Sequence, residues 1–416
     1  MKKRIHFHSD CPYFAGCENM LVSFFQDDNF MESYEVSFSY RYSYAYDVGF
    51  RNRVQRKFDT FPLKLLDMSD IYSYVNKIPF RPMRKLVKLV FNLFLIKYLF
   101  ILLNTYILFK VFRRKRIDLL HINNGGYPGA YSCMSAVFAA KLSGIYHIVY
   151  VVNNIATSYK SPLRWLDFPL DLLVSKFVSY FVTGSKFAAI RLKKVLNLTA
   201  NKYGNIYNGV SQRVLTESKQ EILQRLGINS NRVLLGVIAI LEERKGHIYL
   251  LKAIKLLKEQ GYVKSLPLLI IEGSGTQLEN IQKFVVDCEL TNDVLFIGRE
   301  LNVFNLMNAL DVIILPSINY EDFPNVVIES MGLGKPVIAS ELAGIPEQID
   351  HMKSGIIVKP KDVNGIAEAI KQIIDKPELS NIFGDNGLIK FNEEFTSVVS
   401  VNKYVDLYAR VLKSQP

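Results

Sequence analysis

The sequence predicts an α/β fold built from two doubly wound domains, and three observations lead to this prediction. Its 416 residues exceed what one hydrophobic core usually holds, which favours two domains of roughly 200 residues each. Hydrophobic residues make up 49% of the chain, enough for two cores. Short β-type runs alternate with helical stretches, as in parallel sheets joined by crossover helices. Two such domains facing each other would hold ligands in a cleft at the carboxyl ends of their strands.

The first half contains four strand candidates separated by helical stretches. They are Lys3–His8, Leu119–Asn123, Ile148–Val152 and Phe181–Thr183. The tyrosine-rich interval from Tyr34 to Ser69 is harder to interpret, and we assign no element to it.

The alternation is clearer in the second half, where apolar runs end in Gly, Ser or charge. These runs are VLLGVIAI, LPLLIIEG, VLFIG, DVIILPS, PVIAS and SGIIV, and each precedes a helical stretch. The Asn-Gly turn in NIYNGVSQ, residues 205–212, marks the point after which the strands restart. We therefore predict domains at 1–204 and 205–395, followed by a terminal segment at 396–416.

The charge of the chain points to an anionic partner. A formal charge of +12 suits nucleic acid or an anionic membrane, and no base-reading module argues for nucleic acid. Residues 81–116 interleave apolar and aromatic side chains with four lysines and end in the basic block Arg113–Arg116; the lysines are Lys85, Lys88, Lys97 and Lys110.

This basic, apolar segment is too interrupted to span a membrane as one helix. A span needs about 20 apolar residues, whereas Lys97 divides the run and Tyr98–Phe109 gives only twelve uncharged positions. The composition is typical of a helix or helical pair that lies in the headgroup layer of an anionic bilayer. The alternative is a buried helix whose lysines extend to water.

The cysteines and the N-terminus predict a cytoplasmic protein. Four cysteines are scattered without a CxxC pair or a disulfide-dense pattern, which favours a reducing compartment; they are Cys11, Cys17, Cys133 and Cys288. We expect each to be a buried or idle thiol. The opening MKKRIHFHSDCPY lacks the unbroken apolar stretch of a secretion signal.

A cationic turn follows the first strand of the second half. The stretch GVIAILEERKGHIYLLKAIKLL contains a strand, Leu234–Ile240, then Arg244, Lys245 and Gly246, and then an apolar helix. A cation beside the exposed N–H groups at a helix start is suited to bind phosphate. Lys245 is the first candidate. The alternative is a surface turn made soluble by its charges.

Glycines follow the next two strands. Gly273 and Gly275 lie between a strand and a helix in LLIIEGSGTQLENI, and Gly298 ends the following strand directly before Arg299. Glycine lets a ligand approach the backbone closely, although a lone GxG also occurs in any tight turn.

The stretch EDFPNVVIES, residues 321–330, places two glutamates on either side of a helix start. Pro324 suits the first turn of a helix, and the N–H groups that follow it would bind an anion. Glu329 lies one to two turns inside, where it can accept hydrogen bonds from the vicinal hydroxyls of a ribose. Glu321 stays on the loop and would reach the part of the ligand beyond the phosphates.

These motifs resemble the donor domain of the retaining glycosyltransferases of family 4, which have the GT-B fold. The elements occur in the family's order across residues 205–375: Lys245-Gly246, Gly-Ser-Gly, Gly298, Pro316-Ser317, the E-x7-E core, Gly334-Lys335-Pro336-Val337, Gly344-Ile345-Pro346-Glu347 and Gly355. The resemblance implies two Rossmann-like domains and a closing helix, SVNKYVDLYARVL, that returns to the first domain. It implies Glu321 and Lys245 as catalytic residues. The implied donor-binding residues are Gly16, Arg244, Lys245, Gly273, Gly275, Arg299, Phe323, Pro324, Asn325, Val326 and Glu329.

The first half resembles the family less closely. The family's Gly-Gly pair and glutamate correspond here to Ala15-Gly16-Cys17-Glu18. We expect the loops HINNGGYPGAY and VVNNIATSY to shape acceptor specificity through His121, Gly125, Gly126, Asn153 and Asn154.

Two departures from the family pattern stand out. Ile240 occupies the position of a common arginine, so Arg244 is the candidate substitute, and Asn153 and Asn154 stand where many members have histidine. An amide can hold a sugar hydroxyl but is no base near neutral pH. His121 and His147 remain candidates for that role, with a structural role as the alternative.

The resemblance implies a metal-independent hexosyltransferase acting with retention in cell-surface polysaccharide synthesis, such as lipopolysaccharide or capsule. Its donor would be a nucleotide-diphosphate sugar and its acceptor a hydroxyl of a lipid-linked or growing glycan, with no further cofactor. No acidic DxD-like cluster lies where it could hold a metal ion beside the phosphates. The alternatives are another GT-B enzyme, such as a nucleotide-sugar epimerase or a sugar phosphorylase, and a non-catalytic nucleotide-sugar-binding module on a membrane.

Overall fold

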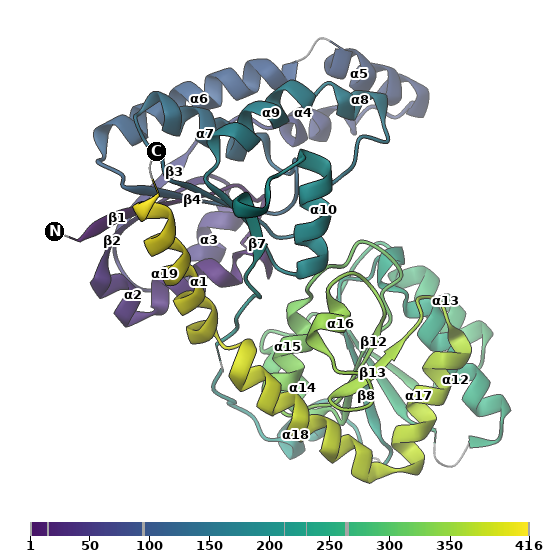
Figure 1. Cartoon of the computed structure of the whole chain (residues 1–416). Coiled ribbons are helices and arrows are strands. Elements are labelled where there is room, and N and C mark those ends of the chain that lie inside the picture. The colour runs from purple at the N-terminus through teal and green to yellow at the C-terminus, as the bar shows by residue number, and fades with distance from the viewer. Residues whose placement is uncertain are drawn as a thin grey trace. The chain divides into compact units, whose positions relative to one another are not determined.

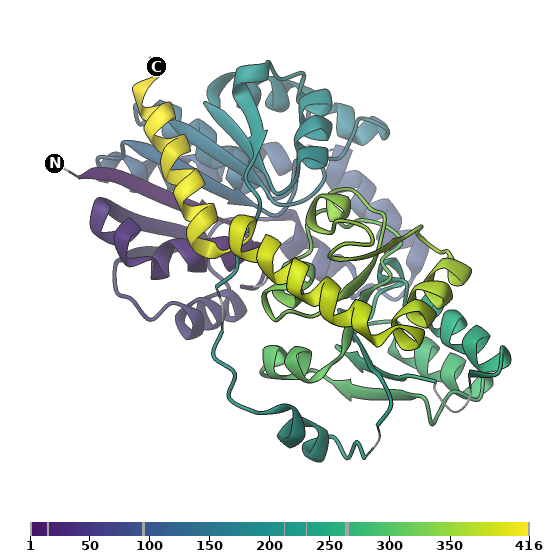
Figure 2. The same ribbon diagram turned by 60° about the horizontal axis from the view of Figure 1, so that its bottom comes forward.

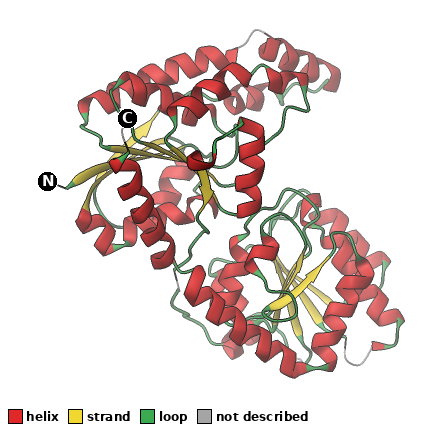
Figure 3. Ribbon diagram, in the orientation of Figure 1, coloured by secondary structure: helices red, strands yellow, loops and turns green. Residues whose placement is uncertain are grey.

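The computed structural model describes residues 2–14, 16–93, 96–211, 213–229, 231–262 and 266–414. The chain divides into two compact units: unit 1 is Met1–Tyr207 with Ser400–Pro416, and unit 2 is Asn208–Val399 (Figure 1). Each unit has a parallel sheet with helices on both faces (Figure 2, Figure 3). The predicted doubly wound α/β architecture is confirmed.

Unit 1 is built on a seven-stranded parallel sheet with the order β3-β2-β1-β4-β5-β6-β7. The strands are β1 (Lys3–Ser9), β2 (Tyr34–Arg41), β3 (Asp59–Leu63), β4 (Leu119–Asn124), β5 (Ile148–Val152), β6 (Tyr180–Thr183) and β7 (Tyr203–Asn205). All four strands predicted in this half are present. The unassigned tyrosine-rich interval contains β2, α3 and β3.

The helices of unit 1 cover both faces of this sheet. They are η1 (Gly16–Glu18), α1 (Asn19–Gln26), α2 (Asp28–Ser33), α3 (Tyr44–Arg53), α4 (Met68–Val75), α5 (Arg81–Leu93), α6 (Ile96–Arg114), α7 (Tyr131–Leu142), α8 (Pro162–Trp165), α9 (Phe168–Phe177), α10 (Lys186–Leu196) and η2 (Ala200–Lys202), with α19 (Ser397–Lys413) from the end of the chain. The apolar side of α19 packs into an aromatic core formed with β1, β2 and α1. The last helix therefore completes the core of the first unit.

Unit 2 is built on a six-stranded parallel sheet with the order β10-β9-β8-β11-β12-β13. The strands are β8 (Leu234–Ile238), β9 (Leu268–Glu272), β10 (Val294–Gly298), β11 (Val312–Leu315), β12 (Val337–Ser340) and β13 (Gly355–Val358). Each of the six predicted apolar runs forms a strand, but β8 ends two residues before the predicted Ile240.

Eight α-helices and one 3-10 turn complete the described part of unit 2, apart from the start of α19. They are α11 (Lys219–Arg225), η3 (Glu243–Lys245), α12 (His247–Glu259), α13 (Leu278–Asp287), α14 (Val303–Ala309), α15 (Asn325–Gly332), α16 (Ile345–Gln348), α17 (Val363–Asp375) and α18 (Pro377–Glu394). Since β8 and β11 are neighbours in a parallel sheet, the loops after them meet at one edge.

Candidate functional site

The cationic turn after β8 packs against the loop after β11. Gly246, which follows η3, has φ 70°, and a Cβ there would lie 2.0 Å from the carbonyl oxygen of Pro316. Ile318 N also donates to the carbonyl oxygen of Arg244 at 2.8 Å. Glycine at position 246 is therefore required for this packing, which fixes Arg244 and Lys245 beside the β11 loop.

Lys245 and Glu321 form the central ion pair of this edge. Lys245 Nζ lies 2.5 Å from Glu321 Oε2, and each side chain is 11% exposed. Ser317 Oγ donates to the same carboxylate oxygen at 2.9 Å. Arg244 lies farther away, with 3.8 Å between its guanidinium nitrogen and Glu321 Oε2. The structure thus brings together the two residues predicted to be catalytic.

Helix α15 starts directly after this pair. Pro324 is the N-cap, with ψ 125°, and Asn325 is the first helical residue; the prediction that Pro324 occupies the first turn is wrong by one position. The N-terminal N–H groups of the helix, where Asn325 and Val326 lie, carry partial positive charge. Glu321, the partner of Lys245, therefore precedes this helix start by four residues in the chain.

Glu329 and Phe323 occupy different surroundings. Glu329 is partly buried in α15 and borders a cavity of about 110 Å³ with Ser211 and Arg213. Phe323 is 6% exposed, and its ring packs against Phe395 at 5.7 Å between centroids. The side chain of Phe323 is therefore part of the hydrophobic core, which leaves only its backbone for donor binding.

The Gly-Ser-Gly turn after β9 packs on the backbone of its neighbour. A Cβ on Gly273 would lie 2.0 Å from Ala239 O, and one on Gly275 would lie 2.4 Å from Leu241 O. These glycines therefore let two strand-end loops pack together, and their predicted contact with the donor stays a prediction. Arg299 is exposed after β10. Ile240, at the position of the missing arginine, is 43% exposed.

In unit 1, a chain of hydrogen bonds joins the carboxyl ends of three strands. Asn153 Nδ2 donates to Asn123 Oδ1 at 2.8 Å, and Asn123 Nδ2 donates to Glu18 Oε2 at 2.7 Å. Ser9 Oγ donates to the other oxygen of Glu18 at 2.8 Å. Burial raises the pKa of Glu18 to about 7, against the effect of its hydrogen bonds. Glu18 and Asn123 were not predicted as site residues, because nothing local in the sequence shows that they meet.

The remaining candidates in unit 1 are Gly16, predicted to bind the donor, and Gly125, Gly126 and Asn154, predicted on the acceptor side. Gly16 begins η1 and is exposed, whereas Gly125 and Gly126 follow β4 and are partly buried. Asn154 Oδ1 accepts a hydrogen bond from Ile155 N at 2.7 Å. These residues therefore lie in loops that follow strands, as predicted.

The two candidate histidines do not lie at this edge. His121 is 2% exposed in β4, its Nδ1 lies 2.5 Å from the hydroxyl oxygen of Tyr408, and burial lowers its pKa to about 3. His147 directly precedes β5, at the amino end of the strand. The prediction of an acceptor-side His121 is corrected, because its ring packs inside the aromatic core, and His147 lies at the opposite edge of the sheet.

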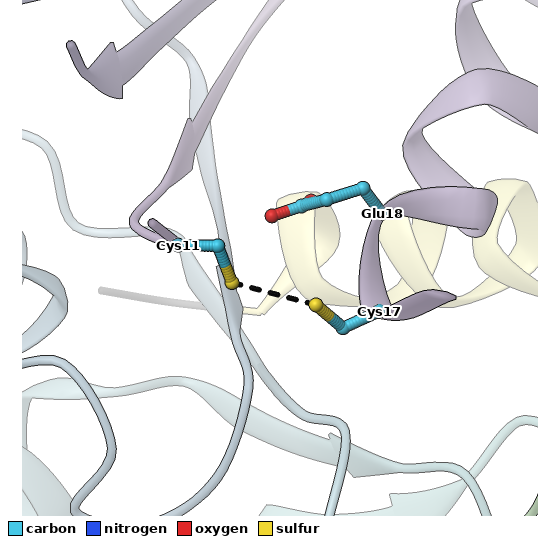
Figure 4. Close-up of side chains that lie close together, drawn as sticks. All are labelled: Cys11, Cys17 and Glu18. Carbon is cyan, nitrogen blue, oxygen red and sulfur yellow. Dashed lines mark hydrogen bonds between the residues drawn. The ribbon is translucent and has the colours of Figure 1, made fainter. Parts of the chain in front are cut away.

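Two cysteines lie beside Glu18 in the loop after β1. Cys11 Sγ and Cys17 Sγ are 3.4 Å apart, and these sulfurs and a carboxylate oxygen of Glu18 all lie within 4.8 Å of one another (Figure 4). The hydrogen bond with Cys17, together with burial, raises the pKa of the Cys11 thiol. The prediction of scattered thiols is therefore wrong for this pair, which the fold brings into contact.

The basic segment 81–116 forms α5 and α6, apart from residues outside the described ranges. Lys97 does not face outward as predicted: its Nζ lies 2.5 Å from Asp167, with the two side chains only 8% and 4% exposed. Arg164 joins the same carboxylate at 3.3 Å. Among the described helices, none alone is long and apolar enough to cross a membrane. Taken together, α5 and α6 have the length and composition for a crossing, but the pair is bent by 55°.

An exposed apolar face extends over α5, α6, α8 and α9, which lie along one side of unit 1 (Figure 1). Tyr98 on α6 donates to the backbone of Leu166, so α6 and the α8–α9 junction are adjacent. We call these exposed side chains the apolar face: Met83, Leu86, Leu89, Val90, Leu99, Leu102, Leu103, Tyr106, Trp165, Leu166, Phe168, Leu172 and Leu173. The α8–α9 part of this face was not anticipated from the sequence.

Comparison with known proteins identifies relatives of both units. Residues 218–389 match the family described as glycosyl transferases group 1. N-acetyl-alpha-D-glucosaminyl L-malate synthase of Bacillus anthracis is 31% identical over 145 residues, 35% of this chain and 38% of the relative, so the chain spans well under half of that protein. UDP-Gal:alpha-D-GlcNAc-diphosphoundecaprenol alpha-1,3-galactosyltransferase of Escherichia coli is 23% identical over 313 residues, 72% of this chain and 77% of the relative.

A solved structure extends the likeness to the whole chain. The crystal structure of Anabaena Alr3699/HepE in complex with UDP covers 99% of this chain and 100% of that chain, with a TM-score of 0.75 and 17% identity. This likeness confirms the predicted GT-B fold. The family match confirms the predicted resemblance of residues 218–389 to glycosyltransferases.

Proposed function

Because residues 218–389 belong to the glycosyl transferases group 1 family in a chain of the GT-B fold, we propose that this protein is a hexosyltransferase. It moves a sugar from a nucleotide-diphosphate donor to a hydroxyl of a lipid-linked or growing glycan, with retention of anomeric configuration. The observation that carries the proposal is the pairing of Lys245 with Glu321 beside the start of α15. It is supported by the named activity of the E. coli relative and by UDP in the Anabaena structure.

The leaving diphosphate is the group that unit 2 is suited to stabilise. Negative charge develops on this group as the anomeric bond breaks, so Lys245, Arg244 and the N-terminal N–H groups of α15 bind the transition state better than the ground state. These cationic and dipolar donors make a metal ion beside the phosphates dispensable. Glu329 would accept hydrogen bonds from the ribose hydroxyls.

Glu321 has a different position in this mechanism. Without donor it neutralises Lys245 at 2.5 Å, so an entering diphosphate competes with the carboxylate for the same ammonium group. The hydrogen bond that Ser317 Oγ donates to Glu321 at 2.9 Å would hold the displaced carboxylate. There it would position the sugar and stabilise the positive charge that develops at its anomeric carbon.

We also propose that the protein acts in the cytoplasm, bound peripherally to the inner face of the cell membrane. The apolar face is bordered by exposed cations, among them Lys85 on α5 and Lys110 and Arg113 on α6. Exposed apolar surface next to cations matches the acyl and phosphate layers of an anionic bilayer. A lipid-linked acceptor would then be presented at the membrane surface.

A donor screen followed by a transfer assay tests the proposed function. The correct nucleotide sugar should raise the melting temperature, because a ligand at 100 times its Kd stabilises the folded protein by about 2.7 kcal/mol. Transfer of the labelled sugar to lipid-linked acceptors should then occur in buffer containing a chelator. Isomerised sugar formed from donor alone would instead indicate an epimerase. Donor binding without transfer to any member of an acceptor panel would favour a non-catalytic module.

A further inference from the structure

The loop after β1 in unit 1 gathers two thiols and a carboxylate from residues close in sequence. Cys11 follows β1, whereas Cys17 and Glu18 lie in η1 at the start of α1 (Figure 4). One ligand atom from each lies within 4.8 Å of the other two. None of the three takes part in the proposed transfer of the sugar.

The carboxylate in this cluster is buried and held in one orientation. Glu18 is fully buried, and its two oxygens accept separate hydrogen bonds from Ser9 Oγ and Asn123 Nδ2. Metal-bound carboxylates are oriented by such outer donors. Within the described residues, no lysine, arginine or histidine forms an ion pair with Glu18, and a buried carboxylate is costly without a counter-charge.

The separation of the sulfurs fits a metal ion better than a disulfide. A tetrahedral Zn²⁺ with Zn–S bonds of about 2.3 Å places two sulfurs roughly 3.8 Å apart, close to the observed 3.4 Å. A disulfide would need the sulfurs to approach to about 2.05 Å. The two sulfurs would therefore move less to bind one Zn²⁺ than to form a disulfide.

We propose that Cys11, Cys17 and Glu18 form a binding site for a thiophilic divalent cation, with Zn²⁺ as the expected ion. Thiolate sulfur selects zinc over magnesium and calcium, which prefer oxygen ligands. Binding releases the two thiol protons to solvent. Three protein ligands leave a fourth position for water or for a substrate oxygen.

This site differs from a metal site beside the donor phosphates, for which the sequence has no DxD-like acidic cluster. The proposed phosphate site is in unit 2, whereas this cluster lies in unit 1 and uses sulfur. The loop after β4 approaches the cluster, since a Cβ on Gly125 would lie 3.9 Å from Cys11 Sγ. The proposal goes beyond the proposed function and does not depend on the identity of the donor.

Metal titration of the full-length, reduced protein tests this site. We expect one Zn²⁺ per chain in competition with a chromophoric chelator, and thiolate-to-cobalt charge-transfer absorption when Co²⁺ is the probe. Cys11→Ser and Cys17→Ser should each remove the absorption and weaken Zn²⁺ binding at least tenfold. Glu18→Gln should keep the absorption but weaken binding.

Cys288→Ser provides the matched control, because Cys288 is also partly buried but lies in unit 2. It should bind both ions as the wild type does, and circular dichroism should show that every variant is folded. Absence of cobalt absorption in folded wild-type protein, or equal loss in Cys288→Ser, would overturn the proposal. So would formation of a Cys11–Cys17 disulfide with oxidised glutathione in protein that binds no metal, because the thiols would then be a redox pair.

Discussion

The ion pair between Lys245 and Glu321 allows donor binding to be separated from turnover. The two side chains are only 11% exposed, and 2.5 Å separates their charged atoms. Removing the charge of one partner leaves the other largely buried and unpaired, so Lys245→Met and Glu321→Gln should each lower the free energy of unfolding by about 2 kcal/mol. The double variant should lose less free energy of unfolding than the sum of the two single variants, because it leaves neither charge without a partner.

The two variants should affect UDP binding in opposite directions. Lys245→Met removes a charge-assisted hydrogen bond worth roughly 1.5–3 kcal/mol, so the Kd for UDP should rise by about tenfold or more. Glu321→Gln removes the competitor for the same ammonium group, so UDP should bind at least as tightly as to the wild type. Turnover should fall at least tenfold in both, a barrier increase of about 1.4 kcal/mol or more.

Isothermal titration calorimetry with UDP measures these affinities, and single-turnover transfer measures the rate. Lys255→Met is the control, since Lys255 forms an exposed pair with Glu259 on α12, with side chains 44% and 59% exposed. It should match the wild type in both assays. Unchanged UDP affinity in Lys245→Met would refute the phosphate role. A weakened affinity in Glu321→Gln equal to that in Lys245→Met would refute the competition between carboxylate and diphosphate.

Three other predictions concern the ribose, the membrane and pH. Glu329→Gln should weaken binding of UDP but not of 2′,3′-dideoxy-UDP, as calorimetry would show; equal losses for both ligands would contradict the ribose contact. Replacing Arg113, Arg114 and Arg116 with glutamine should reduce co-sedimentation with anionic vesicles at low salt. Lys115 is kept because it pairs with Asp59. Trp165→Ala should reduce the fraction of protein that stays bound to the vesicles at high salt. Leu301→Asp, at a fully exposed position in unit 2, should change vesicle binding at neither salt concentration. Since burial lowers the pKa of His121 from 6.5 to about 3, the unfolded chain binds a proton below pH 6.5 that the folded chain does not, so stability is lost as pH falls. Urea unfolding of His121→Gln between pH 4 and 6 should therefore give a pH slope shallower by about 1.4 kcal/mol per unit, and an unchanged slope would show that His121 is not neutral when folded.

The strands that could be predicted are those whose sequence alone reveals their burial. Parallel strands covered on both faces are continuous apolar runs, and this pattern located all six strands of unit 2. β2, YEVSFSYR, has serines where an apolar strand is expected. The structure explains them: Ser37 and Ser39 contact the buried rings of His6 and His8 on β1 at 2.7 to 2.9 Å. The serines alternate with Val36, Phe38 and Tyr40, so β2 has a period-2 pattern rather than the continuous apolar run by which the strands of unit 2 were located.

The candidate site was predictable in position but not in its contacts. Lys245 and Glu321 each follow a predicted parallel strand, so both were expected at the same edge of the sheet. They are 76 residues apart in the sequence, and their ion pair is revealed only by the adjacency of β8 and β11. Lys97 was misplaced for the same reason, since its partner Asp167 lies 70 residues away. The thiol pair was missed because the two cysteines meet through the folding of a loop with no recognisable spacing.

The return of α19 to unit 1 determines the order in which the two units can be finished during synthesis. Val401, Tyr404, Leu407, Tyr408 and Val411 belong to the aromatic core of unit 1, and burying five such side chains contributes on the order of 10 kcal/mol. Unit 2 is contiguous from Asn208 to Val399, so all of its strands have left the ribosome before those five residues are translated. Part of the core of the nascent N-terminal half therefore stays exposed until Val401 to Val411 are translated, and a chain that stops before Ser400 leaves that core unfinished.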